Sequence, residues 1–357
     1  MENEEITEET TIEQPNDLMP SYKRDCLRLG FYLTVIMLIR EIASGLTPLL
    51  VPLAEKMSPT AAFAFSLGYS ALCLQIIPSI LAVFMLKYSL KNLCGGFHAP
   101  RQSKKALANV PAIYGLGMTV NLITMAVMLF INRNSDIGDA INSTGIQPPN
   151  FASSLVLFIL LAVIAPVFEE FVFRGAVMNL LKPYGGGLAV FVSAFGFGIY
   201  HGNFQQFFYA FAVGICFGYI AYATNSLFCS TILHAMFNAV SGVILIFLST
   251  DAVQAKSLDP TAELPDDKQL IVTFYAIFMI IVLITAVIGF IAMINKLRRI
   301  KKYRLPKVWG EVSNGKKVKV LLLTVPVTIS VLLMIDVMIP QFLTQAIQQW
   351  AQAISAV

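Results

Sequence analysis

A short stretch in the middle of the chain, IAPVFEEFVFRGAV, places three ionisable side chains in an apolar run. They are Glu169, Glu170 and Arg174, and each is costly to place in the hydrocarbon of a membrane. Ionisable residues at such positions usually belong to functional sites. Two carboxylates with an arginine favour proton-transfer chemistry, which serves either catalysis or transport.

Few other ionisable side chains occur between residues 151 and 248. Apart from Lys182 at a helix end, the acidic, basic and histidine side chains of this range are Glu169, Glu170, Arg174, His201 and His234. At about 1.5 Å of rise per helical residue, Glu169 and His201 each lie ~20 Å from the turn that joins their helices. His234 and Asn238 lie ~12 and ~18 Å from the start of a later helix. We therefore expect four polar groups on three helices to meet at roughly one level of the membrane.

The spacing within the first of these helices predicts a division of labour between the two carboxylates. Glu170 and Arg174 are four residues apart, so they can form an ion pair on one helix face. Glu169 points about 100° away from Glu170 in a regular helix. We expect Arg174 to neutralise Glu170 in a structural role, which leaves Glu169 free to act.

Two further pairs have the same spacing. His234 and Asn238, in HAMFN, lie on one helix face. Phe197 and His201, in FGIYH, are also four residues apart, so the phenyl ring can support the imidazole from the preceding turn.

The three motifs together resemble those of a known family. EEFVFR, FGIYH and HAMFN are similar to the EExxxR, FxxxH and HxxxN motifs of the CAAX-protease and bacteriocin-processing family of intramembrane proteases, which includes the type 2 CAAX prenyl endopeptidases. The similarity extends over residues 155–243. It implies hydrolysis of a peptide bond within the membrane by a water molecule.

The resemblance also implies a role for each motif residue. Glu169 corresponds to the general base that activates water, and His201 helps to hold that water. His234 and Asn238 correspond to the groups that stabilise the oxyanion, while Glu170 and Arg174 are structural. Oriented donors in a water-poor cavity stabilise a tetrahedral intermediate better than solvent does.

A zinc enzyme is the alternative to a metal-free glutamate protease. Glu169, His201 and His234 could ligate zinc and leave one position open for water. Asn238 is a poor zinc ligand and a good oxyanion donor, which favours the metal-free mechanism. The sequence leaves both mechanisms open.

Composition predicts an all-α, polytopic membrane helix bundle. Of the 357 residues 57% are hydrophobic and 13% are charged, about half the charged share of a soluble domain. Nine segments are apolar over roughly the 20 residues that span a bilayer. They lie at 27–50, 60–86, 107–131, 152–181, 188–203, 204–223, 226–249, 269–294 and 318–339.

We expect four regions around a CAAX-protease-like core. They are an acidic, disordered cytoplasmic tail (1–26), additional transmembrane helices (27–150), the catalytic core (151–249) and further transmembrane helices with a basic cytoplasmic loop (250–357). Lysine and arginine collect on one side of the nine spans, which predicts a cytoplasmic amino terminus. The net charge of +4 follows from this topology and indicates no nucleic-acid site. In the first span, adjacent Arg40 and Glu41 point apart and are expected to be structural.

These observations predict a multi-pass protein of a bacterial plasma membrane. The expected activity is that of an intramembrane endopeptidase that cleaves a membrane-associated peptide or protein near the cytoplasmic half of the bilayer, in bacteriocin or peptide processing or in self-immunity. Its partners would be that substrate and the lipid bilayer. The alternatives are a non-catalytic immunity or scaffold protein and a transporter that uses the Glu/His cluster as a proton relay. No oligomeric state is predicted.

Overall fold

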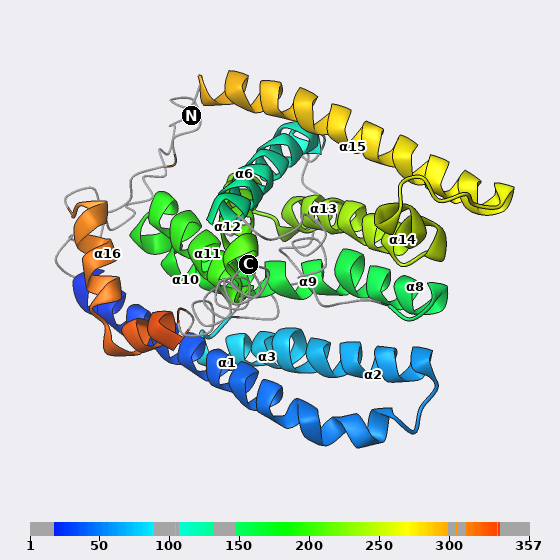
Figure 1. The fold of residues 1–357 in the computed structure, drawn as a ribbon. Coiled ribbons are helices and arrows are strands. Elements are labelled where there is room, and N and C mark those ends of the chain that lie inside the picture. Colours follow the sequence, from blue (N-terminus) through cyan, green and yellow to red (C-terminus); the bar gives the residue numbers. More distant parts are fainter. Residues whose placement is uncertain are drawn as a thin grey trace, which may run out of the picture.

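The structure, a computed structural model, describes residues 18–88, 104, 107–131, 148–298, 305, 312–333 and 335. Every regular element in these ranges is a helix, as the predicted all-α class requires (Figure 1). The prediction of a disordered tail over 1–26 is wrong for residues 18–26, which form the start of α1 (Leu18–Ala54) because the apolar face of this segment is buried. The rest of that tail lies outside the described residues. So does most of the basic stretch between the last two predicted spans.

The described residues include six helices that are long and apolar enough to cross a membrane. They are Leu18–Ala54, Pro59–Met85, Phe151–Tyr184, Gln206–Thr224, Leu227–Leu248 and Asp266–Lys296. Two shorter apolar helices, Val110–Thr124 and Gly186–Tyr200, coincide with two more of the predicted spans. The chain is a polytopic helical membrane protein.

The last predicted span, 318–339, is not one continuous helix. α16 (Asn314–Leu322) ends after two and a half turns, and a new helical segment begins three residues later. Pro326 has no N–H to offer the carbonyl of Leu322, four residues earlier. The hydroxyl of Thr328 donates to that carbonyl instead. A proline inside the apolar run therefore divides the segment.

The helix that carries Glu169 contains two π-helical segments. It runs through α8 (Phe151–Ile159), η2 (Leu160–Ile164), α9 (Ala165–Glu170), η3 (Phe171–Val177) and α10 (Met178–Leu181), and it ends in the single turn η4 (Lys182–Tyr184). The two π segments, η2 and η3, flank the two glutamates. π-Helical turns are rare and occur frequently at functional sites.

Three more helices complete the central bundle. They are α11 (Gly186–Tyr200), α12 (Phe204–Thr224) and α13 (Leu227–Leu248). α11 packs against α12 and η3, whereas α13 packs against α8, η2 and α9. The asparagine and serine before α12 and α13, Asn203 and Ser226, accept backbone N–H groups of the first turn, which fixes where each helix begins.

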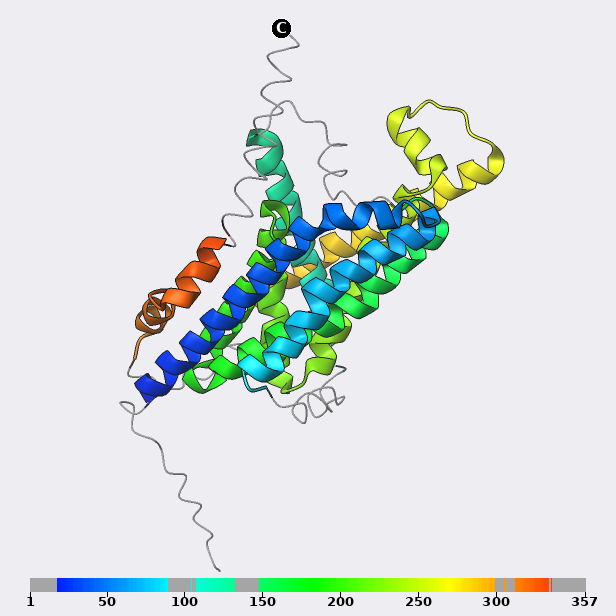
Figure 2. The ribbon, with the colours of Figure 1, turned by 90° about the horizontal axis from the view of Figure 1, so that it is seen from below.

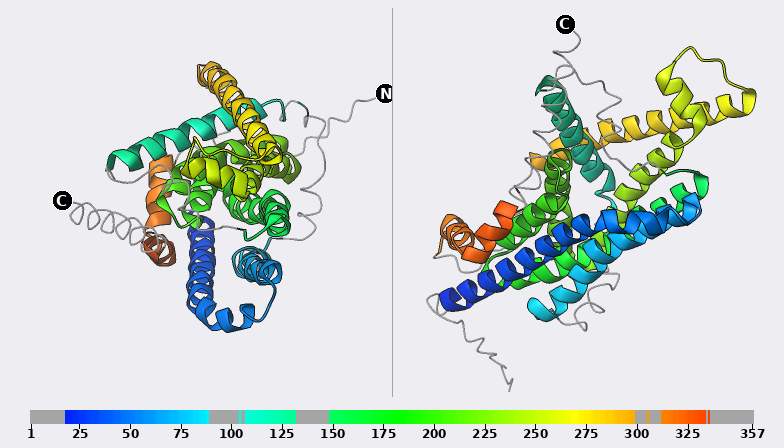
Figure 3. Two further views of the ribbon diagram at one scale, coloured as in Figure 1. Left: turned by 45° about the vertical axis from the view of Figure 1, so that its right-hand side comes forward. Right: turned by 60° about the horizontal axis from the view of Figure 1, so that its bottom comes forward.

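Two layers flank this bundle (Figures 1 and 3). On one side lie α1 (Leu18–Ala54) and a second long helix made of α2 (Pro59–Ala71), η1 (Leu72–Ile76) and α3 (Ile77–Met85). Figure 2 shows this pair running beside α8 and α9, and η1 contacts α9 directly. On the other side α6 (Val110–Ile131) crosses α15 (Asp266–Leu297), which follows the short α14 (Asp251–Leu258).

Candidate active site

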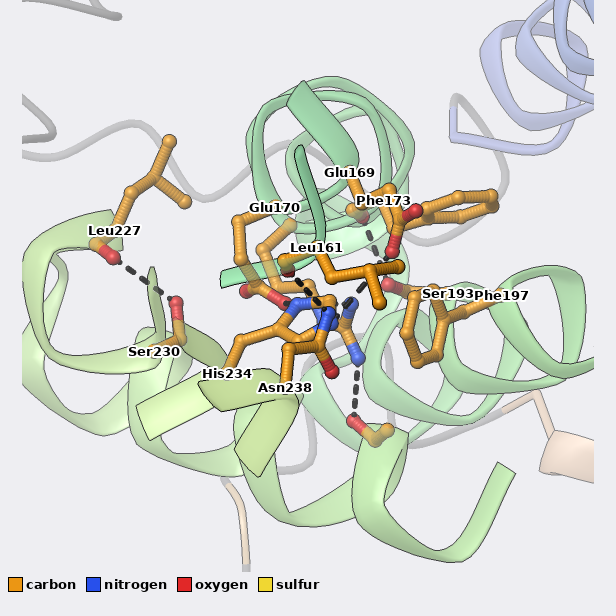
Figure 4. A network of polar contacts seen from close by, with 12 residues as sticks. Leu161, Glu169, Glu170, Phe173, Ser193, Phe197, Leu227, Ser230, His234 and Asn238 are labelled. Carbon is orange, nitrogen blue, oxygen red and sulfur yellow. Dashed lines mark hydrogen bonds and ion pairs between the residues drawn. The ribbon is translucent and has the colours of Figure 1, made fainter. Parts of the chain in front are cut away.

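His234 lies between the two glutamates (Figure 4). Its Nδ1 is 3.2 Å from Oε1 of Glu170, and its Nε2 is 3.6 Å from Oε2 of Glu169. The side chain of Glu170 is fully buried, whereas that of Glu169 is 16% exposed. A regular helix would direct the two carboxylates about 100° apart. They nevertheless contact the two nitrogens of one imidazole. A carboxylate only accepts hydrogen bonds, so Glu170 fixes Nδ1 as a donor and directs Nε2 at Glu169.

Arg174 pairs with Glu170, as their spacing predicts. Nη1 of Arg174 lies 2.8 Å from Oε1 of Glu170, and both side chains are 0% exposed. Nη2 donates to the carbonyl of Gly214 at 3.1 Å, and a Cβ on this glycine would come within 3.2 Å of the same nitrogen. The guanidinium also lies 4.4 Å from the ring centre of Phe197 and 5.7 Å from that of Phe217. Arg174 is therefore enclosed by α11 and α12 while it holds Glu170.

The buried pair is only partly satisfied. Within the described residues, Nε of Arg174 and Oε2 of Glu170 have no hydrogen-bond partner. Such a pair is a poor source of stability, because its desolvation cost is not fully offset. Its position behind His234 indicates another role, which is to fix the orientation of the imidazole.

His201 lies at the carboxyl end of α11, where the helix stops. Its Nδ1 is 2.8 Å from the carbonyl oxygen of Phe197. Because a carbonyl only accepts, Nδ1 donates and the neutral ring presents Nε2 as an acceptor. Glu169 lies within electrostatic range of this imidazole. The predicted water-holding histidine is therefore near the predicted base.

Phe197 separates the two histidines. Its ring centre lies 4.9 Å from that of His201 and 5.4 Å from that of His234, with both contacts edge-to-face. The expected support of His201 by Phe197 is present, and the same ring also supports His234 and Arg174. One phenyl ring thus positions three members of the site.

Asn238 supplies a hydrogen bond that is missing within the helix of Glu169. The N–H of Ala165 donates to Leu160, five residues back, and Pro166 has no N–H. Neither residue is then available to the carbonyl of Leu161, which instead accepts from Nδ2 of Asn238 at 2.9 Å. Nδ2 carries a second hydrogen that this bond does not use. Asn238 thus fastens α13 to the π segment that precedes the glutamates.

A second proline leaves a comparable gap in the helix of η1. Pro78 offers no N–H to the carbonyl of Leu74, four residues earlier. That carbonyl accepts from the hydroxyl of Tyr200 at 2.5 Å. Tyr200 precedes His201, so this bond connects η1 to the end of α11.

Arg40 of α1 holds the same end of α11. Its Nη1 donates to the carbonyl of Tyr200 at 2.6 Å. The guanidinium lies against Gly202, where a Cβ would fall 2.0 Å from Nη2, and the backbone of Gly202 has φ +69°. Only glycine fits there, for both reasons. This contact fits the structural role expected of Arg40.

The three candidate zinc ligands do not form a metal site. Across the described parts of the chain, no group of three or more His, Cys, Asp or Glu side chains is placed to hold a metal ion. His234 faces Glu169 through one nitrogen, but its other nitrogen is engaged by Glu170. His201 is bound to the Phe197 carbonyl through Nδ1. A zinc-ligating histidine commonly donates its other ring N–H in this way, so these contacts leave Nε2 of each histidine as the nitrogen that could ligate. The described side chains form no preformed zinc centre because they are not grouped closely enough, and the proposed mechanism uses no metal.

The central bundle matches a known sequence family. Residues 151–240 match the family of Rce1-like type II CAAX prenyl endopeptidases. The match confirms the predicted relationship. The Rce1-like segment begins with α8, ends two residues after Asn238 and contains all seven site residues predicted from the sequence. Comparison with curated proteins and with solved structures gave no match.

Several contributors to the site have no motif of their own. Phe217 of α12 stacks on His234 with ring centres 5.3 Å apart, and it lies inside the Rce1-like segment. Arg40, Leu74 and Tyr200 join the segment to the first two spans. No local sequence pattern indicates which ring or helix end lies against the histidines.

Proposed function

We propose that the chain is an intramembrane endopeptidase in which Glu169 activates a water molecule. The observation that carries this proposal is the orientation of His234. Its Nδ1 is held by the buried Glu170–Arg174 pair, and its Nε2 faces the partly exposed Glu169. A general base next to an oriented imidazole, inside a bundle of apolar helices, is suited to acyl-transfer chemistry.

The proposed reaction begins with removal of a proton from water by Glu169. The water oxygen bonds to the carbonyl carbon of the peptide, and the carbonyl oxygen becomes an oxyanion. His234 acts here as the imidazolium, because Nδ1 already donates to Glu170, and it donates to the oxyanion from Nε2. The second amide hydrogen of Asn238 adds a donor. Collapse of the intermediate breaks the C–N bond, and the proton taken from water passes to the leaving nitrogen. His201 accepts a hydrogen bond at Nε2 and so helps to hold the water.

The same arrangement supports a cytoplasmic orientation for the amino terminus. Tyr22 of α1 donates to the carbonyl of Lys317, and Nζ of Lys317 donates to the carbonyl of Tyr184. The basic starts of α1 and α16 therefore meet beside η4 at one end of the bundle. Basic residues favour the cytoplasmic side, which puts Glu169 ~20 Å from that face.

The substrate would be a membrane-associated peptide or protein in a bacterial plasma membrane. Bacteriocin or peptide processing and self-immunity are the settings that the motifs support. The test compares peptides released in membranes that contain the wild type or Glu169→Gln at equal amounts. Products that depend on Glu169 would name the cleaved sequence. Identical peptide profiles in the two membranes would contradict the proposal.

A further inference from the structure

Arg40 of α1 carries a positive charge at the depth of the candidate active site. Helical rise places it ~18 Å beyond Arg28, which lies at the basic end of the same helix. Its hydrogen bond to the carbonyl of Tyr200 puts it next to the end of α11. A charge at such a depth is costly, and charged residues within spans usually have a partner and mark a functional site.

The contacts of Arg40 leave part of its guanidinium free. Nη1 donates to the carbonyl of Tyr200. Nε and Nη2 make no hydrogen bond within the described residues and, unlike Nε of Arg174, are not enclosed. Within the same residues no carboxylate is paired with Arg40. Glu41, the next residue in the chain, attracts it only from a distance. One neutral carbonyl therefore leaves this charge without a paired counter-ion.

The guanidinium lies beside the groups that are proposed to bind and activate water. Arg40 and Glu169 are both within electrostatic range of the Tyr200 hydroxyl and of the His201 imidazole. The guanidinium also lies against Gly202, the residue after His201. A peptide whose carbonyl group is attacked between Glu169 and His201 therefore comes within reach of Arg40.

We propose that Arg40 binds a carboxylate of the substrate and so selects peptides that carry an acidic group near the cleaved bond. Nε and Nη2 form the side of a guanidinium that can donate to both oxygens of one carboxylate. The carboxylate belongs either to the chain end of the peptide or to an Asp or Glu side chain, and the test distinguishes the two. The inference rests on the proposed function and adds a residue from outside the Rce1-like segment.

The depth of Arg40 argues against a lipid phosphate as its ligand. The hydrocarbon of a bilayer is about 30 Å thick, and the headgroups lie at its two surfaces. Arg40 lies ~18 Å from Arg28 and ~21 Å from Ala54, at the other end of α1. A peptide that enters the site brings its own carboxylate to this depth, whereas a headgroup phosphate stays at the surface.

The test measures kcat/KM for the full-length protein in detergent, with the peptide that the comparison of membranes identifies as a substrate. The peptide is made unchanged, with its chain end amidated, and with each Asp or Glu replaced by Asn or Gln. One of these changes should lower kcat/KM of the wild type about 10–100-fold. In Arg40→Gln the same change should matter by less than about twofold, because its partner is already absent. Arg40→Lys keeps the charge but loses the two parallel hydrogen bonds, so its dependence should be intermediate.

The matched control is Arg28→Gln, because Arg28 lies in the same helix but is paired with Asp25. This variant should distinguish the peptides as the wild type does. If Arg40→Gln slows all peptides by the same factor, Arg40 only holds α11 and the inference is wrong. If Arg40→Gln does not accumulate, the same comparison with Arg40→Lys decides.

The peptides also separate this inference from the proposed function. A wild type that cleaves all of them equally fast contradicts the inference, although the protease assignment stands. A wild type that cleaves none of them contradicts the proposed function itself. Loss of cleavage on amidation alone assigns the chain end as the ligand of Arg40, and loss at one Asp or Glu assigns that side chain.

Discussion

Asn238 donates a 2.9 Å hydrogen bond to the carbonyl of Leu161, which Pro166 leaves without a donor in its own helix. The bond joins α13, which carries His234, to the π segment one turn before the glutamates. A residue expected to stabilise an oxyanion therefore also holds two catalytic helices together. The two roles can be separated by experiment.

Asn238→Ala should reduce both stability and activity. Loss of the amide leaves a partly buried carbonyl unpaired, which costs about 1–3 kcal/mol. It also removes an oxyanion donor, with an expected loss of about 10²–10³-fold in kcat. Adding Pro166→Ala returns an N–H to the helix beside Leu161. The double variant should regain thermal stability but not kcat, and a full recovery of kcat would show that Asn238 acts only through the helix.

Replacement of either member of the Glu170–Arg174 pair should reduce the amount of folded protein. Arg174→Ala leaves a carboxylate buried and unpaired, a loss of about 3–5 kcal/mol. The double variant Glu170→Gln with Arg174→Met removes both charges and should accumulate better than either single variant. Its catalysis should stay low, because a neutral amide replaces the charged acceptor that holds Nδ1 of His234.

The control for this pair is Arg28→Ala. Arg28 forms a 3.0 Å ion pair with Asp25, but it is 30% exposed, and such pairs contribute about 0–1 kcal/mol. Protein yield and thermal stability should therefore be near those of the wild type. An Arg174→Ala protein that accumulates and cleaves like Arg28→Ala would show that the buried pair has no bracing role.

Gly202→Ala should disturb the end of α11. The new Cβ would meet the guanidinium of Arg40, and a residue other than glycine at positive φ costs about 1–2 kcal/mol. Gly187→Ala, at the start of the same helix, meets nothing within 4 Å and is the matched control. Thermal stability and kcat should fall in Gly202→Ala and stay near the wild-type values in Gly187→Ala. Adding Arg40→Ala should relieve the collision but not the backbone strain, so a partial recovery of stability is expected.

Chelation should leave the activity unchanged. Within the part of the chain that the structure describes, no three His, Cys, Asp or Glu side chains are placed to hold a metal ion, and the proposed mechanism needs none. Prolonged incubation with a chelator and elemental analysis of the purified enzyme check this. Activity that is lost on chelation and restored by zinc, with one metal per chain, would require a different arrangement of His201 and His234.

The sequence predicts much of the central bundle for simple physical reasons. Spans appear as apolar runs because the bilayer fixes their length. The pairing of Glu170 with Arg174 follows from a spacing of four residues, which π segment η3 does not disrupt. The convergence of Glu169 and His234 follows roughly from the similar depths that helical rise predicts for them in the membrane. These features depend on local geometry alone.

The remaining features depend on how helices pack. A regular helix predicts that Glu169 and Glu170 diverge, but both meet His234 because α13 lies against a helix interrupted by two π segments. Pro166, Pro78 and Pro326 are visible in the sequence, yet in the first two cases the donor that replaces the missing N–H comes from a helix far away in the chain.

The central claim is that Glu169 activates water, and Glu169→Gln tests it most directly. The amide keeps the shape of the side chain but cannot take a proton from water, and it opens no cavity, so the variant should insert and unfold like the wild type. With a confirmed substrate in liposomes, we expect cleavage to fall by about 10²–10⁴-fold. Protein amount and thermal stability are measured in parallel. A well-folded Glu169→Gln protein that cleaves at near the wild-type rate would contradict the account.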